Sequence, residues 1–251
     1  MSKFRIIPII LIDGINILKG NKFNSWRPIG SIIPALNIFE NRDVDELMLI
    51  DVNATRENRS FDIELIKEAS KILSIPLTVG GGIKSLKCIE DALKAGADKV
   101  LIGTAPVIYP ELVLKASENF GSQSLICSVD IKIEETESIY INSGSKRISK
   151  TPNEYAKEVI DAGAGEILVQ TIDRDGMLEG MDLKIPIEIK LKNPNTPILI
   201  SGGFANQSEI NEIYENGFSG LGIGALFQFT EVTPNMLRNY MLDSGFKTRK
   251  I

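Results

Sequence analysis

Two glycine-rich stretches decide the fold: Val79-Gly80-Gly81-Gly82 and Ile200-Ser201-Gly202-Gly203. Each follows a short apolar run entered through a proline, and each precedes residues with the apolar spacing of a helix. Glycine allows an anion to reach several backbone N–H groups, and a helix N-terminus adds a favourable partial charge. A single glycine pair after a strand is often only a turn. The spacing between the two copies must therefore decide between a turn and a phosphate-binding loop.

The two stretches belong to a repeat. Gly82 and Gly203 are 121 residues apart, and residues 95–103 and 216–224 are related by the same offset. A constant offset through strand, loop, helix and next strand indicates two copies of one half-structure. Two halves of four βα units in 251 residues predict a closed (β/α)₈ TIM barrel that occupies the chain, 1–251, as one domain. The repeat also predicts two phosphate sites where the strands end, suited to a substrate with a phosphate at each end.

The individual elements follow from apolar runs and their spacing. Strands are expected at 5–12, 46–51, 99–104, 125–130, 166–171 and 220–224, with two more entering the glycine stretches. Helices are expected near 32–40, 63–73, 86–95, 110–120, 153–162, 183–189 and 208–215, then from 225 and at 234–241, and a hairpin is expected within 134–149.

Composition narrows the possible functions. A hydrophobic content of 43% and a net charge of −5 suit a globular α/β domain and do not support nucleic acid or a membrane surface as partner. Because no apolar run reaches membrane-spanning length and nothing resembles a signal peptide, we expect a cytoplasmic protein. Cys88 and Cys127 lack metal-site spacing and are expected to be reduced. No metal and no cofactor are expected.

The chain contains no histidine. This excludes histidine general bases, Ser-His-Asp triads within the chain and histidine-ligated metals. Acid–base chemistry must therefore come from carboxylates, lysines or the substrate.

Asp130 is the leading candidate for a catalytic carboxylate. It ends the predicted strand 125–130, and alternation places Ile126, Ser128, Asp130 and Lys132 on the inner face. A partly desolvated carboxylate there can act as a general base. The alternative is a helix cap or an ion pair with Lys132.

Other candidates lie at further strand ends. The connection 13–30 after the first strand is long enough to be a binding loop or lid, with Lys19 at its tip; a solvated surface lysine is the alternative. Asp51 ends the second strand, where ligand-orienting carboxylates and helix caps both occur. Asp175 and Gly176 close a charged loop that is expected to complete the phosphate site of Gly202 and Gly203.

Four charged residues stand directly before four predicted strands: Arg5, Glu46, Lys99 and Glu166. They place two cations and two anions around the lower mouth of the barrel, opposite the phosphate sites. Such charges usually form a solvated rim or structural ion pairs. The alternative is a gate that closes a central channel.

The sequence resembles the cyclase subunit of imidazole glycerol phosphate synthase, the HisF family, over essentially its whole length. The stretches that carry the resemblance are Arg5-Ile6-Ile7, Lys19-Gly20, Asp45-Glu46-Leu47, 79–83, 97–100, 120–123, Asp130, 163–168, 172–176 and 201–203.

The resemblance implies a partner and a mechanism. Family members dock a HisH-like glutamine amidotransferase on the lower face, and its ammonia crosses the barrel to a substrate with two phosphates. A dry channel fits this chemistry, because water would protonate ammonia. The residues that match the family's gate are Arg5, Glu46, Lys99 and Glu166, and those that match its subunit contact are Asp98 and Gln123. Gly103, Thr104, Gly224 and Ala225 stand at the strand ends where the phosphate groups are expected to bind.

The departures from the family concern the chemistry. The family uses two aspartates as an acid–base pair; Asp130 matches the second, but Leu11 stands at the position of the first. Loss of a positioned acid or base typically costs about 10² to 10⁴ in rate. Asp13 has the same strand parity as Leu11 and could substitute, although it would sit about 6 to 7 Å further along the strand. Gly103 and Ala225 replace the usual asparagine and serine.

These departures resemble a divergent branch of the family that is associated with surface polysaccharide synthesis. There, ammonia is thought to convert an acetamido group on a nucleotide-linked sugar into an acetamidino group, with the help of a further enzyme. One alternative is authentic imidazole glycerol phosphate synthesis for histidine, with Asp13 as the missing acid. Another is a barrel without catalysis that binds a phosphorylated ligand or activates the amidotransferase.

Overall fold

Eight parallel strands pair edge to edge and close into a barrel in the computed structural model, which describes residues 3–42, 44–134 and 137–248. In order around the barrel they are β1 (Arg5–Asp13), β4 (Leu47–Asp51), β5 (Leu77–Gly80), β6 (Lys99–Ile102), β7 (Leu125–Ile131), β10 (Glu166–Thr171), β11 (Ile198–Ser201) and β12 (Gly220–Ile223). β12 pairs with β1 and closes the circle. The predicted (β/α)₈ barrel is therefore confirmed.

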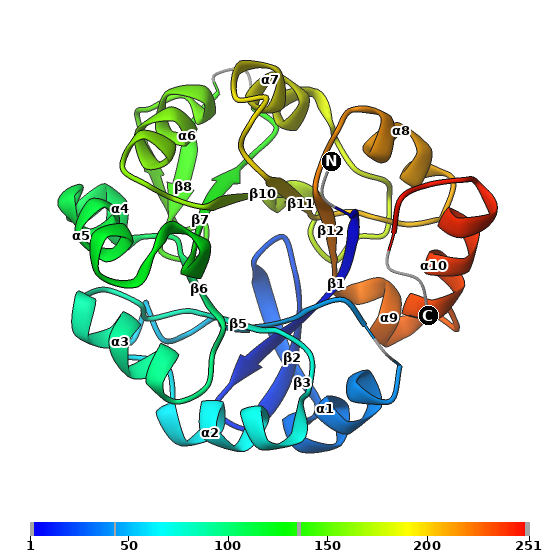
Figure 1. The fold of residues 1–251 in the computed structure, drawn as a ribbon, viewed down its shortest axis with the longest axis horizontal. Coiled ribbons are helices and arrows are strands. Elements are labelled where there is room, and N and C mark those ends of the chain that lie inside the picture. The colour runs from blue at the N-terminus through cyan, green and yellow to red at the C-terminus, as the bar shows by residue number, and fades with distance from the viewer. Residues whose placement is uncertain (1–2, 43, 135–136, 249–251) are drawn as a thin grey trace.

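Helices surround the strands and follow the chain once around the barrel (Figure 1). They are α1 (Ile32–Glu40), α2 (Ile63–Ile72), α3 (Leu86–Lys94), α4 (Ala105–Ile108), α5 (Glu111–Phe120), α6 (Pro152–Asp161), α7 (Lys184–Lys192), α8 (Glu209–Glu215), α9 (Ala225–Phe229) and α10 (Pro234–Asp243), with 3₁₀ turns η1 (Ser122–Ser124) and η2 (Ile172–Arg174). Among the described residues, no helix is long and apolar enough to cross a membrane.

One short helix was missed by the sequence analysis. α4 was not predicted, because its four residues are too few to show a helical period. The helices predicted after the two glycine stretches are present, with residues 83–85 before α3 and residues 204–208 before α8.

Two apolar clusters fill the fold. One lies between the strands and the helices. The other lines the barrel interior and consists of Ile7, Ile9, Met48, Leu101, Ile126, Leu168 and Leu199. Strands buried on both faces explain the continuous apolar runs in the sequence. Because Ile126 faces the interior, alternation carries Ser128 and Asp130 of β7 inward as well, as predicted.

Two antiparallel hairpins interrupt the βα pattern, one after β1 and one after β7. The first consists of β2 (Asn16–Asn21) and β3 (Asn24–Ser31), and the second of β8 (Ile139–Ile141) and β9 (Lys146–Ile148). The second lies within the predicted segment 134–149, of which residues 135–136 are outside the described part. In the first hairpin, Lys19 lies within β2; the tip is formed by Lys22 and Phe23, whose φ angles are positive. The predicted position of Lys19 at the tip is therefore wrong.

Candidate functional site

A cavity of about 250 Å³ opens at the carboxyl ends of the barrel strands. A second space of about 20 Å³ lies beside it, lined by Gly202 and Gly203. Four predicted residues line both: Asp175, Gly176, Gly224 and Ala225. The large cavity also brings together Lys19, Asp51, Gly81, Gly82, Gly103, Thr104 and Asp130. The two glycine stretches thus line two neighbouring cavities at one end of the barrel.

Asp130 presents a buried carboxyl group to the large cavity. Its Oδ1 atom has no hydrogen-bond partner among the described residues. Burial raises the pKa of Asp130 to about 7, with a hydrogen bond to Ser128 acting against the rise and the charge of Asp175 adding to it. A carboxyl group with this pKa can accept and release a proton near neutral pH.

Lys132 does not share the cavity with Asp130. It was expected on the inner face, but its Nζ atom lies 4.3 Å from the centre of the Tyr140 ring, and Lys132 does not line the cavity. β7 ends at Ile131, so the alternation that predicted this position stops one residue too early.

Lys19 and Asp175 join the first hairpin to the loop after β10. The Nζ atom of Lys19 donates to the carbonyl oxygens of Gly20 (2.6 Å) and Gly176 (2.8 Å), and the N–H of Lys22 donates to the carbonyl of Asp175 (2.9 Å). Burial lowers the pKa of Lys19 and raises that of Asp175 to about 6. The Lys19 charge opposes the rise at Asp175. The hairpin is therefore held against the cavity by polar contacts.

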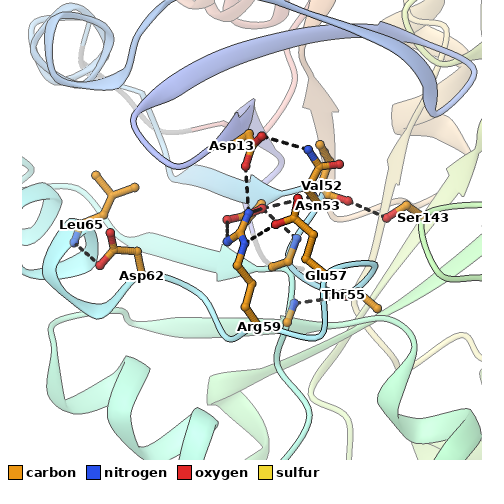
Figure 2. A network of polar contacts seen from close by, with 12 residues as sticks. Asp13, Val52, Asn53, Thr55, Glu57, Arg59, Asp62, Leu65 and Ser143 are labelled. Carbon is orange, nitrogen blue, oxygen red and sulfur yellow. Dashed lines mark hydrogen bonds and ion pairs between the residues drawn. The ribbon is translucent and has the colours of Figure 1, made fainter.

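Leu11 takes the inward position near the end of β1 and lines the cavity, whereas Asp13 lines neither cavity. The Asp13 carboxylate is 42% exposed and accepts hydrogen bonds from Arg59 Nη2 (2.9 Å) and Asn53 Nδ2 (3.0 Å). Figure 2 shows these contacts. The geometry gives no support to Asp13 as a substitute for the missing aspartate, because its side chain is engaged outside the cavity.

Arg59 is a cavity residue that the sequence did not reveal. Its guanidinium contacts Asp51 (2.5 Å), Glu57 (2.6 Å) and Asp13 (2.9 Å). Figure 2 labels Glu57 and Asp13 beside Arg59. Hydrogen bonds to Asp51 and Glu57 raise the pKa of Arg59 further above its usual range. Asp51 also accepts the N–H groups of Asn53 and Ala54. Asp51 therefore organises the loop after β4, and its charge is neutralised within that loop.

Gly81 and Gly202 occupy equivalent backbone positions in the two half-barrels. Both have a φ of +98°. A Cβ atom would lie 2.1 Å from the carbonyl oxygen of Asp51 at Gly81, and 2.5 Å from that of Thr171 at Gly202. Close packing of each loop on the preceding strand end therefore requires glycine, whether or not an anion binds there.

We expect Gly81→Ala to lower the free energy of unfolding by about 2 to 3 kcal/mol, because the strained φ and the clash with Asp51 act together. Urea denaturation measures the difference. Gly30→Ala is the matched control, since a Cβ there has no atom within 4 Å and the φ is not positive. Equal effects at the two positions would contradict this explanation of the glycine stretch.

The four charges at the lower mouth form a closed ring, the charged ring of Arg5, Glu46, Lys99 and Glu166. Lys99 Nζ lies 2.9 Å from Glu46 and 2.7 Å from Glu166, and Arg5 contacts the same two carboxylates. The Glu46 side chain is only 2% exposed and also accepts a hydrogen bond from Thr78 (2.6 Å). Although burial acts to raise the pKa of Glu166, its contacts with Arg5 and Lys99 lower it overall. The arrangement does not fit a solvated rim.

The two residues matched to a subunit contact lie near this ring. Asp98 directly precedes β6, is exposed, and accepts the N–H of Leu77 through Oδ2 (2.8 Å). Gln123 in η1 directly before β7 is also exposed. Both side chains are thus accessible at the lower face.

The described residues contain no group of three or more His, Cys, Asp or Glu side chains that could hold a metal ion. Cys88 and Cys127 are both free. The cavity offers carboxyl groups, the side chains of Lys19 and Arg59, and the backbone N–H groups of the glycine stretches.

Comparison with known proteins identifies the family. A family model described as histidine biosynthesis protein matches residues 5–233. The imidazole glycerol phosphate synthase subunit HisF of Clostridium botulinum (strain Okra / Type B1) is 34% identical over 249 residues, covering 98% of each chain. The HisF subunits of Natranaerobius thermophilus and Chlorobium phaeobacteroides are 35% and 34% identical over 247 residues, with the same coverage. The chain therefore belongs to the histidine biosynthesis protein family and is a HisF-like enzyme subunit.

Proposed function

We propose that this chain is the ammonia-using synthase subunit of a glutamine amidotransferase complex. One observation carries the proposal: the charged ring lies at one end of the barrel, and the cavity with the Asp130 carboxyl group opens at the other. The relatives are named as subunits of imidazole glycerol phosphate synthase, which agrees with this division of labour.

The barrel interior between the two ends suits neutral ammonia. It is lined by aliphatic and methionine side chains, namely Ile7, Ile9, Met48, Leu101, Ile126, Leu168 and Leu199. An apolar passage favours NH₃ over NH₄⁺, because burial of an unpaired charge is costly. Ammonia that arrives neutral is still a nucleophile.

Asp130 is proposed as the base of the reaction. When ammonia attacks an electrophilic carbon of the acceptor, the N–C bond forms, the bond from that carbon to the leaving oxygen breaks, and the nitrogen must lose a proton. The ionised Asp130 carboxylate would take up that proton, and its raised pKa makes it a stronger base than an ordinary aspartate. The two glycine stretches, Gly103 and Thr104 are proposed to hold the phosphate groups of the acceptor, with Lys19 and Arg59 contributing positive charge.

The amidotransferase is proposed to dock on the lower face, around the charged ring. The test is binding of this chain to the HisH-like glutamine amidotransferase of the same organism, measured by calorimetry and by the rate of glutamine hydrolysis. We expect Asp98→Asn to weaken the complex about tenfold by removing a charge while keeping an acceptor for the Leu77 N–H. Lys84→Gln at the opposite mouth is the control and should leave binding unchanged. The opposite pattern, or no complex, would contradict the docking face.

For the acceptor, we propose a nucleotide-linked acetamido sugar that becomes an acetamidino sugar, as in surface polysaccharide synthesis. Support comes from Leu11 in the cavity wall and from Asp13, which is engaged by Arg59 and Asn53. This cavity presents no carboxylate at the end of β1. The acetamido oxygen would leave after activation by the further enzyme of that route, so the one proton transfer that the amination asks of this chain is the one assigned to Asp130.

Imidazole glycerol phosphate synthesis is the second candidate function. Full-length identity of 34–35% to HisF subunits favours it. It would need a group other than Leu11 to supply the missing proton transfer. A barrel without catalysis would instead bind the phosphorylated ligand and the amidotransferase without turnover.

A further inference from the structure

The Asp175 carboxyl group is buried between the two cavities and has no role in the proposed function. Asp175 lines both cavities, beside the glycines expected to bind the second phosphate. The backbone N–H of Phe23 hydrogen-bonds to its carboxyl group. The Oδ2 atom, however, is buried and has no hydrogen-bond partner among the described residues. The Oδ2 atom of Asp175 is therefore available to a donor on a bound ligand.

A phosphate in the small cavity would meet this carboxyl group. The charged groups that face Asp175 are Lys19 from β2 and Asp130 from β7. A carboxylate and a dianionic phosphate cannot both remain unprotonated in contact, so one proton must lie between them. A phosphate monoester has its second pKa near 6. Burial raises the pKa of Asp175 only to about 6, so at pH 7 most of this carboxyl group is ionised and the phosphate has to supply the proton. Sulfate offers no proton there.

We propose that Asp175 makes the second anion site selective for phosphate monoesters and against sulfate, through a single proton shared between Oδ2 and a phosphate oxygen. The proton stays on the phosphate, which donates it to the ionised Asp175 carboxylate. No covalent bond to carbon or phosphorus changes. The inference rests on the proposed function, because it takes the second cavity to hold a phosphate.

The first anion site provides an internal reference. Asp51 borders it beside Gly81, and the two Asp51 carboxylate oxygens already accept hydrogen bonds from Arg59 and from the N–H groups of Asn53 and Ala54. An anion bound at Gly82 therefore meets a neutralised carboxylate and needs no shared proton. We expect this site to bind phosphate and sulfate similarly.

The experiment follows the amide resonances of Gly82 and Gly203 in the full chain, labelled with ¹⁵N-glycine, as sodium phosphate or sodium sulfate is added at pH 7 and constant ionic strength. Gly82 should respond equally to both anions. Gly203 should require at least about tenfold more sulfate than phosphate, the order expected for leaving a buried acceptor unpaired. In Asp175→Asn this preference should disappear, because the amide can donate to either anion. Asp161→Asn, at an exposed carboxylate on α6, is the control and should keep it.

Equal responses of Gly203 to both anions in the unsubstituted chain would overturn the inference and leave the phosphate site in place. A tenfold preference that persists in Asp175→Asn would overturn it in the same way. If phosphate shifts neither glycine, the assignment of the phosphate sites fails, and the inference fails with it.

Discussion

Asp130→Asn is expected to make the protein more stable above neutral pH, by about 2 to 4 kcal/mol at pH 8. The pKa of Asp130 is raised from its ordinary value of 3.8 to about 7, so the folded protein retains a proton that the unfolded chain releases. A carboxyl group whose pKa is higher in the folded than in the unfolded state contributes its full stability to the fold below the unfolded pKa. This contribution to the free energy of unfolding is lost as the pH rises from about 4 to 7. Asparagine never ionises and so avoids the loss.

Urea denaturation at pH 4.5 and pH 8 measures this effect. Asp161→Asn is the matched control, because the Asp161 side chain is 62% exposed on α6. We expect the gap between Asp130→Asn and the unsubstituted chain to widen with pH, and the gap for Asp161→Asn to stay constant. A pH-independent difference at Asp130 would mean that burial does not perturb this carboxyl group.

Asp130→Asn should also lower the activity of the protein. A positioned base contributes about 10² to 10⁴ in rate, so its loss should lower the ammonium-dependent turnover of the acceptor by that factor. Residues that destabilise the fold and serve the chemistry commonly show this opposition. An Asp130→Asn chain that is both more stable and fully active would show that the carboxyl group has no role in catalysis.

Glu46→Gln is expected to lower the free energy of unfolding by about 3 kcal/mol. Glu46 is buried and contacts both cations of the charged ring, so its neutralisation leaves Arg5 and Lys99 to share Glu166 alone. Removing one partner of a buried ion pair typically costs about 3 to 5 kcal/mol, because the remaining charge is uncompensated. Glutamine keeps an acceptor for Thr78, so the loss reports charge and not the hydrogen bond.

Glu90→Gln on α3 provides the control. Glu90 also contacts two lysines, Lys94 (2.5 Å) and Lys87 (3.7 Å), but on the exposed surface. Exposed pairs contribute little, so we expect a change within about 0.5 kcal/mol. If the two substitutions had equal effects, the charged ring would be no more than a surface network.

The sequence predicted the barrel because the repeat is a one-dimensional signal. The offset between Gly82 and Gly203 needs no knowledge of the fold, and a parallel barrel places all strand ends on one face. The same logic placed Arg5, Glu46, Lys99 and Glu166 together, since each precedes a barrel strand. Their contacts depend on side-chain reach, which the sequence does not specify.

The sequence did not predict the contacts of side chains whose positions depend on loops. Arg59 stands in an irregular loop eight residues after Asp51, and no periodicity relates it to Asp13 on another strand. Lys19 could not be placed, because the register of the first hairpin determines where the tip lies. Nor could the sequence show that Asp13 pairs with Arg59 and Asn53 and does not line the cavity, since strand parity only extrapolates from Leu11.

Leu11 stands where the family has its first catalytic aspartate, so it is the residue that most directly tests whether this chain has the family's usual chemistry. The decisive measurement is turnover of the family's two-phosphate ribulosyl substrate with ammonium chloride at high pH, by the unsubstituted chain and by Leu11→Asp. Ammonium salt supplies the nucleophile without the amidotransferase. We predict turnover at least about 100-fold faster in Leu11→Asp, because a restored carboxylate supplies the missing proton transfer. Equal or faster turnover by the unsubstituted chain would contradict the proposed acceptor and assign the protein to imidazole glycerol phosphate synthesis.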